Sequence, residues 1–205
     1  MKFVNWFLNK LGVFYKLLVR LYWDVKLSHS IFYFSKDTPS ISNTAYKTQS
    51  VDYLLLIEAL KLVPFDSFSG IRIADVGCGA GRLLAYLNSR NQRNIYTGYE
   101  INHNIAEDAK KFFSSISNVN IILGDVLEEE CNHDFYILFN PFPSEVFSRF
   151  LRLIGKRGII LYINASDQHV EVANSYEFLY EIECVVLNKP ICSIDGTKVI
   201  LLHSK

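Results

Sequence analysis

The side chains that could do chemistry in this chain stand where short apolar stretches end. Asp75 lies at the close of the first such stretch, Glu100 follows the second and Asp125 follows the third. Asn140 ends a fourth. Carboxylate oxygens accept hydrogen bonds from hydroxyl and amino groups, and each such charge-assisted bond is worth about 1.5–3 kcal/mol. One acid that binds both hydroxyls of a ribose and a second that accepts from an adenine amino group would form a nucleoside site.

A glycine-rich loop, GCGAG, directly follows the first apolar stretch. Gly77 and Gly79 allow a tight turn and a close approach to a ligand, where a Cβ atom would clash. Gly81 lets the next helix begin close against a sheet. The spacing is G-x-G-x-G and not the G-x-G-x-x-G of dinucleotide folds, because Arg82 stands where the third glycine would fall. Asp75 can hold the amides of this loop and reach a ligand ammonium group through water.

Each of these residues also has a purely structural interpretation. Glu100 could cap the next helix, and the Gly-Asp pair at Asp125 is also an ordinary turn. Asn140 precedes Pro-Phe-Pro, whose prolines stiffen the backbone. That segment could be a rigid connection into the next helix. Alternatively, it could fix the oxygen of Asn140 as an acceptor and offer the ring of Phe142 as a flat stacking surface.

The elements that would position these residues alternate between strand and helix patterns. The expected strands are 71–76, 94–99, 119–123, 135–139, 158–163, 178–187 and 197–203, and the expected helices are 50–62, 82–89, 104–115, 144–154 and 169–174. Such alternation predicts an α/β fold with a doubly wound, mostly parallel seven-stranded sheet. The last two strands have no helix between them, which predicts a C-terminal antiparallel hairpin. Ligands of such sheets bind beyond the carboxyl ends of the strands, where the candidate residues stand.

The N-terminal segment is a separate feature. Residues 2–27 show the pattern of one amphipathic helix, and residues 1–36 hold six basic residues and one acid, Asp24, for a net charge of +5. The apolar run between Lys10 and Lys16 has five residues, whereas a signal peptide needs roughly seven to fifteen and a spanning helix about twenty. The helix would dock on its own domain or on a second subunit, or lie in the plane of an anionic membrane.

Length and composition set the limits of this organisation. The chain has 205 residues, half of them apolar, which suffices for one α/β domain with an extension. We expect the helix and a turn-rich linker at 1–49 and the domain at 50–205. The net charge of zero argues against a general nucleic-acid binder.

The cysteines are accompanied by no C-x-x-C pair and no zinc-like His spacing. We therefore expect reduced thiols, no metal and a cytoplasmic protein, with association at the inner face of the membrane as an option. The cysteines are Cys78, Cys131, Cys184 and Cys192.

Four segments resemble the motifs of one enzyme family, in the order in which that family carries them. ADVGCGAGR resembles the first motif of the class I (Rossmann-like) S-adenosylmethionine-dependent methyltransferases, and GYEIN resembles their ribose-binding motif. GDV resembles the adenine-contacting motif, and FNPFP the motif that borders the substrate. The resemblance runs from about residue 71 to 142, and the closing hairpin suits the same fold. DVGCGAGR with FNPFP is especially similar to small bacterial methyltransferases distantly related to the Dot1-type lysine methyltransferases.

The resemblance implies a role for each matching position, with S-adenosyl-L-methionine as the cofactor. Asp75 and the glycine loop would surround the methionine end, Glu100 would bind the ribose and Asp125 the adenine. The other cofactor positions are Gly77, Cys78, Gly79 and Gly81 in the loop, and Ile101 and Val126 beside the ring. Asn140 and Phe142 would border the methyl acceptor as the catalytic residues.

The FNPFP segment departs from the family's pattern. Methyltransferases of nucleobase or glutamine amino groups carry Asn or Asp followed by Pro-Pro-aromatic, whereas one proline precedes Phe142. Asn140 still favours N-methylation, and a neutral amine needs little base catalysis, whereas a hydroxyl would need a base or a metal. The candidate bases are Glu145, His133 and His169, and Tyr46 or Gln49 could close over the cofactor.

Two other functions are compatible with the sequence. An NAD-dependent oxidoreductase would also use a glycine loop and a strand-end acid, although the loop spacing, Asp125 and FNPFP argue against it. A non-catalytic methyltransferase-like module would bind partners or a membrane. For an enzyme, the compatible acceptors are small metabolites, protein side chains and membrane-linked glycans or lipids.

Overall fold

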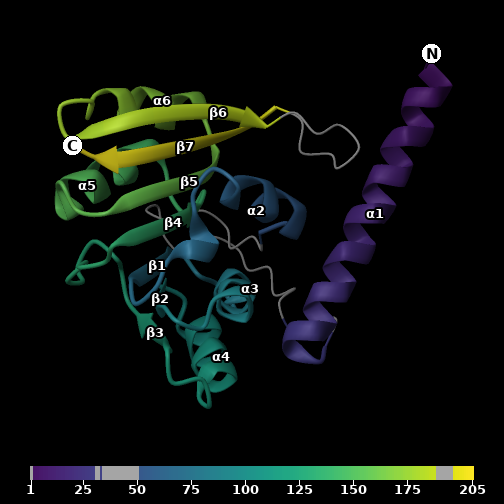
Figure 1. Ribbon diagram of the computed structural model, residues 1–205, viewed down its shortest axis with the longest axis horizontal. Coiled ribbons are helices and arrows are strands. Elements are labelled where there is room, and N and C mark those ends of the chain that lie inside the picture. Colours follow the sequence, from purple (N-terminus) through teal and green to yellow (C-terminus); the bar gives the residue numbers. More distant parts are fainter. Residues whose placement is uncertain (1, 31–32, 34–50, 188–195) are drawn as a thin grey trace.

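Seven strands form a mostly parallel sheet in the computed structural model, which describes residues 2–30, 33, 51–187 and 196–205 (Figure 1). The strands are β1 Arg72–Val76, β2 Ile95–Glu100, β3 Val119–Leu123, β4 Phe135–Phe139, β5 Ile159–Ala165, β6 Tyr180–Leu187 and β7 Thr197–Ser204. Their order in the sheet is β3-β2-β1-β4-β5-β7-β6. The first five pair in parallel, and β7 lies antiparallel between β5 and β6. The predicted fold class is therefore confirmed.

Helices cover both faces of the sheet, because successive side chains of each strand point to opposite sides. The helices are α1 Lys2–Ser28, α2 Tyr53–Leu60, the 3-10 helix η1 Phe65–Ser67, α3 Arg82–Arg90, α4 His103–Phe113, α5 Ser144–Ile154 and α6 Asp167–Asn174. On one face Ile73 packs with Leu84 and the other buried residues of α2, α3 and α4. On the other face Tyr136 packs with Phe150 and the buried residues of α5 and α6. This is the doubly wound arrangement (Figure 1).

Helix α2 is shorter than the predicted 50–62. Asp52 caps it, because its carboxylate accepts hydrogen bonds from the amides of Leu54 at 2.8 Å and Leu55 at 3.4 Å. The helix ends at Leu60. The first residue of the predicted helix, Ser50, lies outside the described residues, as do the predicted lid residues Tyr46 and Gln49 and the thiol of Cys192.

Helix α1 docks on the domain through its C-terminal part. Asp24 is fully buried (0% exposed), and its carboxylate accepts from Arg82 Nη2 at 3.0 Å and from the hydroxyl of Tyr53 at 2.8 Å. The ring of Trp23 packs edge-on against Tyr86, with centroids 4.8 Å apart. Docking on its own domain, one of the interpretations left open by the sequence, therefore accounts for this end of the helix. None of the helices in the described part of the chain is long and apolar enough to cross a bilayer.

Candidate active site

The glycine loop between β1 and α3 depends on left-handed backbone conformations. Gly77 and Gly81 have φ angles of +76° and +84°, which glycine adopts readily. The amides of Gly77 and Cys78 both donate to the carbonyl oxygen of Tyr99 at 2.9 Å, which ties the loop to the end of β2. A Cβ atom on Gly81 would overlap the ring of Phe113 in α4. The loop therefore reaches its position because glycine stands at these places.

The thiol of Cys78 is part of the packing beneath this loop. A Cβ atom on Gly98 in β2 would lie 2.7 Å from its sulfur, so the glycine provides the room that the thiol occupies. Burial raises the pKa of the Cys78 thiol well above its usual value, and the charges of Asp75 and Glu100 act in the same direction. The thiol therefore stays protonated and uncharged. The role that remains for Cys78 is the predicted contact with the cofactor, made through its backbone. Gly98 was missed by sequence reasoning, although a glycine inside a predicted strand is a signal of close packing.

Glu100 connects two loops at the carboxyl end of β2. It is 5% exposed; one carboxylate oxygen accepts from the amide of Gly79 at 2.9 Å and the other from the amide of Asn102 at 2.8 Å. Asn102, and not Glu100, caps α4. The amide of Gly124 donates to the carbonyl oxygen of Glu100 at 3.0 Å, which brings the end of β3, with Asp125, next to it.

Asp75 is a buried carboxyl beside the same loop. Its Oδ2 atom has no hydrogen-bond partner among the described residues. Burial and the nearby charge of Glu100 raise the pKa of Asp75 to about 8. A buried carboxyl without a partner fits a ligand that brings a positive charge, because that charge stabilises the ionised form.

We expect the ligand-free chain to lose stability with rising pH through Asp75. The unfolded carboxyl titrates near 3.8 and the folded one near 8, so between these values the folded chain binds more protons and the free energy of unfolding falls as the pH rises. The stabilisation is complete below about pH 4 and lost through about pH 8. Urea unfolding across this range should show that Asp75→Asn lacks the slope, and parallel curves for the two proteins would contradict the assignment.

The predicted adenine end lies at the carboxyl end of β3. Asp125 is half-buried, and its Oδ1 atom accepts from the amide of Leu127 at 3.0 Å. The ordinary turn considered for this residue is therefore present, with the carboxylate held beside the end of β2. Of the two predicted apolar neighbours, Ile101 is 37% exposed and Val126 is buried. The contacts of all three residues with an adenine stay predictions.

Asn140 ends β4 in a left-handed conformation, with a φ angle of +44°. Residues other than glycine seldom adopt this conformation, and strained residues cluster at functional sites. Asn164 at the corresponding end of the neighbouring strand β5 is also left-handed, with φ +63°. A Cβ atom on Gly77 would lie 2.9 Å from the Cβ of Pro141, so the segment after Asn140 touches the glycine loop. The structure thus brings the predicted cofactor loop and the predicted acceptor segment together.

Two buried side chains hold Asn140 in place. The hydroxyl of Tyr162 donates to Asn140 Oδ1 at 3.2 Å and lies 2.9 Å from Nε2 of His169. The amide of Ser166 donates to His169 Nδ1 at 3.2 Å, so the proton of the neutral ring is on Nε2, which donates to the carbonyl oxygen of Phe142 at 3.0 Å. Burial lowers the pKa of His169, although the Phe142 carbonyl acts in the opposite direction. His169 is therefore a neutral positioning residue.

Three sequence-based expectations for this segment are corrected. The ring of Phe142 is 4% exposed and packs against Phe147 and Phe150 of α5, so it offers no stacking surface in this structure. His169 is not an open base, because both ring nitrogens are hydrogen-bonded in the core. His133 is buried just before β4, at the amino end of that strand, away from the carboxyl ends where the site lies.

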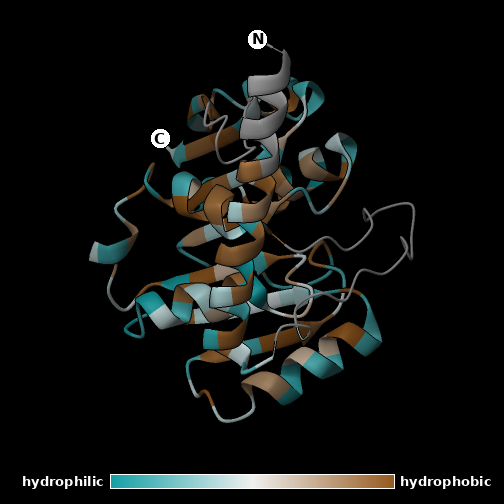
Figure 2. Ribbon diagram, turned by 90° about the vertical axis from the view of Figure 1, so that its right-hand side faces the viewer, coloured by the Kyte–Doolittle hydropathy of each residue, from teal (hydrophilic) through white to brown (hydrophobic). Residues whose placement is uncertain are grey.

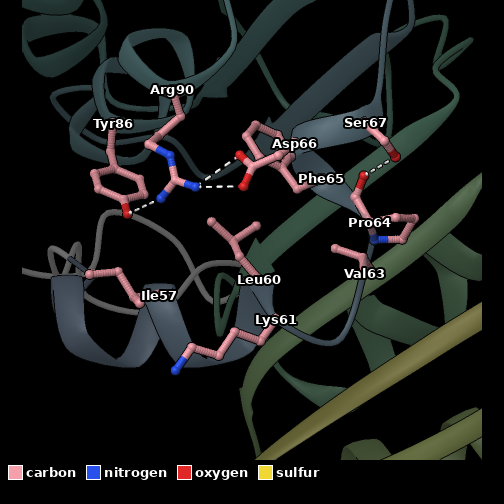
Figure 3. Close-up of a pocket in the computed structure, with 10 residues that line it drawn as sticks. All are labelled: Ile57, Leu60, Lys61, Val63, Pro64, Phe65, Asp66, Ser67, Tyr86 and Arg90. Atoms are coloured by element: carbon pink, nitrogen blue, oxygen red, sulfur yellow. Dashed lines mark hydrogen bonds and ion pairs between the residues drawn. The ribbon is translucent and has the colours of Figure 1, made fainter.

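A cavity of about 390 Å³ lies apart from these residues (Figure 3). It is bounded by α2, η1 and the C-terminal end of α3, whereas the glycine loop precedes the N-terminal end of α3. An ion pair between Arg90 and Asp66, 2.6 Å long, forms part of its wall. The full lining is Ile57, Leu60, Lys61, Val63, Pro64, Phe65, Asp66, Ser67, Tyr86 and Arg90. Since no predicted site residue lines it, this cavity is separate from the candidate active site.

Strand order, closing hairpin and glycine loop together define the class I, Rossmann-like methyltransferase fold. Solved structures share it. The pyocyanin biosynthetic protein PhzM is 19% identical with a TM-score of 0.58, over 75% of this chain and 55% of that chain. Magnesium protoporphyrin IX methyltransferase from Synechocystis PCC 6803, solved with S-adenosylmethionine bound, is 13% identical with a TM-score of 0.56, over 74% of this chain and 79% of that chain. Fibrillarin from Aeropyrum pernix, with natively bound S-adenosyl-L-methionine, is 16% identical with a TM-score of 0.54, over 71% of this chain and 74% of that chain.

The sequence comparison gives the family. Residues 46–147 match the family model of the methyltransferase small domain, and no curated protein matches the chain in sequence. The chain spans just over half the length of PhzM. By fold and family model the chain belongs to the class I methyltransferases, and the cofactor of this class is S-adenosyl-L-methionine. The residues present fit that cofactor, because its positive charge would suit the buried oxygen of Asp75 that has no hydrogen-bond partner in the described part of the chain.

Proposed function

We propose that the chain methylates a neutral amine nitrogen of an acceptor held beside Asn140. The observation that carries this proposal is the left-handed conformation of Asn140, φ +44°, at a strand end that touches the glycine loop through Pro141. Asn tolerates this conformation better than most residues, and the hydroxyl of Tyr162 orients its side-chain oxygen. An oriented amide can accept a hydrogen bond from an amine and so align its lone pair with the methyl group.

The cofactor residues keep the roles predicted from the sequence in this proposal. Asp75 would pair with the positive charge at the methionine end, Glu100 would bind the ribose and Asp125 the adenine amino group. The loop residues Gly77, Cys78, Gly79 and Gly81 would contact the cofactor through their backbone, with Ile101 and Val126 beside the adenine. The bound cofactor supplies an activated methyl group on a sulfonium, and the protein orients the acceptor and excludes water. Phe142 would act through its carbonyl oxygen, which holds the imidazole of His169.

An amine acceptor is favoured over a hydroxyl by the proton chemistry of the site. His169 is neutral and fully hydrogen-bonded, so it is not placed to remove a proton. A neutral amine attacks without prior deprotonation and loses its proton to water afterwards, whereas a hydroxyl needs a base. Glu145, exposed in the first turn of α5, is the base that a hydroxyl acceptor would have to use. An amine acceptor also agrees with the resemblance to lysine methyltransferases.

A paired acceptor panel tests the proposal. The full chain is incubated with S-adenosyl-L-methionine labelled in its methyl group and with pairs of acceptors that differ in one atom, an amine in one and a hydroxyl in the other. The pairs include lysine and hydroxylated peptides, small metabolites and lipid headgroups. We expect label in amine members and little in their hydroxyl partners. Label in the hydroxyl members, lost in Glu145→Gln, would instead establish O-methylation.

Calorimetry separates the proposal from the other functions. We expect S-adenosylhomocysteine to bind and NAD not to bind, whereas the reverse would indicate an oxidoreductase. Binding of S-adenosylhomocysteine without methylation of any acceptor would favour a non-catalytic module.

A further inference from the structure

Helix α1 docks on the domain with a mixed face that includes Val19, Trp23 and Leu27. It leaves an apolar stripe exposed to the solvent. Lys16 pairs with Asp52 at 3.4 Å, and Asp24 pairs with Arg82 at 3.0 Å, so these two charged residues of the helix also contact the domain. Large apolar residues on the other side recur every third or fourth position, which places them in one line along the helix. They are between 45% and 58% exposed. This outer stripe consists of Leu11, Phe14, Leu18, Tyr22 and Val25; Figure 2 looks onto this side of α1, where hydrophobic residues predominate.

The outer stripe is larger than the scattered apolar exposure of ordinary surfaces. It extends over residues 11–25, about 21 Å of helix at 1.5 Å per residue. Single exposed apolar side chains are normal on a soluble domain, whereas a continuous patch of aromatic and aliphatic residues marks an interaction surface. Docking of α1 on α2 and α3 leaves this surface uncovered by the residues that the structure describes.

The charges around the outer stripe indicate what covers it. Asp24, the one acid in residues 1–36, is fully buried against Arg82 and therefore presents no negative charge outward. Lys26 lies at the edge of the stripe, with its ammonium 4.7 Å from the Trp23 ring centroid and 5.5 Å from that of Tyr22. Lys beside aromatic rings is the arrangement that lets an ammonium reach lipid headgroups while the rings enter the boundary below them.

A second copy of the chain suits this surface less well than a lipid surface. Residues 1–36 carry a net charge of +5, and their one acid, Asp24, is buried, so two such helices would bring like charges together. An anionic bilayer offers both apolar volume for the stripe and negative headgroups for Lys26 at its edge. We propose that α1 lies in the plane of an anionic membrane, with the outer stripe buried at the headgroup boundary.

This attachment would also hold the active site at a fixed place relative to the membrane. Arg82, the partner of buried Asp24, is the first residue of α3 and directly follows the glycine loop. Because this ion pair is buried, separating its partners would leave an uncompensated charge in the interior, which costs free energy. The helix and the cofactor end of the sheet therefore move as one body. Membrane binding needs neither cofactor nor acceptor, so it is independent of the proposed methyl transfer.

Flotation with vesicles tests the proposal on the full chain. The vesicles are phosphatidylcholine with phosphatidylserine in one arm and phosphatidylcholine alone in the other. We expect the native chain to float with the anionic vesicles, less in high salt and less with the neutral ones. Leu18→Glu should reduce flotation about tenfold or more, because one stripe residue no longer enters the apolar boundary. The matched control is Phe178→Glu, the same kind of change at a residue that is 66% exposed on another surface, and it should float like the native chain.

Two further measurements decide how a negative result is understood. Circular dichroism and binding of S-adenosylhomocysteine should be unchanged in Leu18→Glu, since Leu18 is exposed and makes no core contact that the fold needs. Equal flotation of Leu18→Glu and Phe178→Glu would overturn the proposal, as would a native chain that stays unbound. Sedimentation velocity covers the other occupant: a native dimer that Leu18→Glu dissociates, without vesicle binding, would assign the outer stripe to a second copy of the chain.

Discussion

Replacing Glu100 with Ala should nearly abolish binding of S-adenosylhomocysteine. In the folded chain the Glu100 carboxylate accepts from the amides of Gly79 and Asn102, so its removal loosens the glycine loop and the start of α4 together. The proposed bonds to the two ribose hydroxyls are lost as well. At about 1.5–3 kcal/mol for each charge-assisted bond, loss of two such bonds corresponds to a rise in Kd of at least about 100-fold, which isothermal titration calorimetry can measure.

The control variants separate the carboxylate from general damage. Glu100→Gln keeps the shape but has one carbonyl oxygen, so it cannot accept from both amides, and we expect a loss almost as large as that of Ala. Glu177→Ala removes an exposed acid just before β6, the edge strand on the far side of the sheet from β2, and should leave Kd unchanged. Native-like binding by Glu100→Gln would show that the negative charge at this position is dispensable.

The four strand ends could be predicted from the sequence because their signals are local. The apolar stretches, the glycine loop and the acid or amide after each stretch are all contained within segments of a few residues. In a doubly wound sheet these ends share one edge, and the structure places Gly77 against Pro141 and Asp125 beside Glu100 as that rule requires. Local pattern and fold class together were therefore sufficient to place the candidate site.

The contacts that hold Asn140 could not be predicted, because they depend on the three-dimensional packing of distant residues. Tyr162 lies inside an apolar strand whose pattern indicates core, and its hydroxyl reaches Asn140 across 22 positions of the chain. The ring of Phe142 is buried because α5 places Phe147 and Phe150 against it. A Pro-Phe-Pro segment in the sequence does not show whether such partners exist, so the ring was assigned to the wrong surroundings.

The orientation of α1 shows a related limit of sequence patterns. Periodicity identifies the residues that share a face, but it does not say which face meets the domain. The face that docks here contains Asp24 beside apolar residues such as Trp23. Arg82, 58 positions away from Asp24, provides a buried partner for its carboxylate. With that carboxylate satisfied inside the molecule, the apolar residues of the outer stripe face outward, where a solvated amphipathic helix would carry polar residues.

Removing the side chain of Asn140 should slow methyl transfer while leaving cofactor binding in place. Asn140→Gly is the informative variant, because glycine accepts the φ angle of +44° without strain, so the change isolates the amide. We expect kcat to fall about 100-fold with the acceptor found by the panel, since a misaligned acceptor costs about that much. The Kd of S-adenosylhomocysteine should change little, because no cofactor contact is assigned to this side chain.

Tyr162→Phe completes the test by removing the hydroxyl that orients Asn140. A positioning residue should act through kcat more than through KM, and loss of one ordinary hydrogen bond of about 1 kcal/mol predicts a fall of about fivefold. In the double variant the Tyr162→Phe change should have no further effect, because the amide on which the hydroxyl acts is already gone. If Tyr162→Phe instead lowered kcat by the same factor in the native chain and in Asn140→Gly, Tyr162 would serve the core alone. An unchanged kcat in Asn140→Gly would mean that Asn140 takes no part in the reaction.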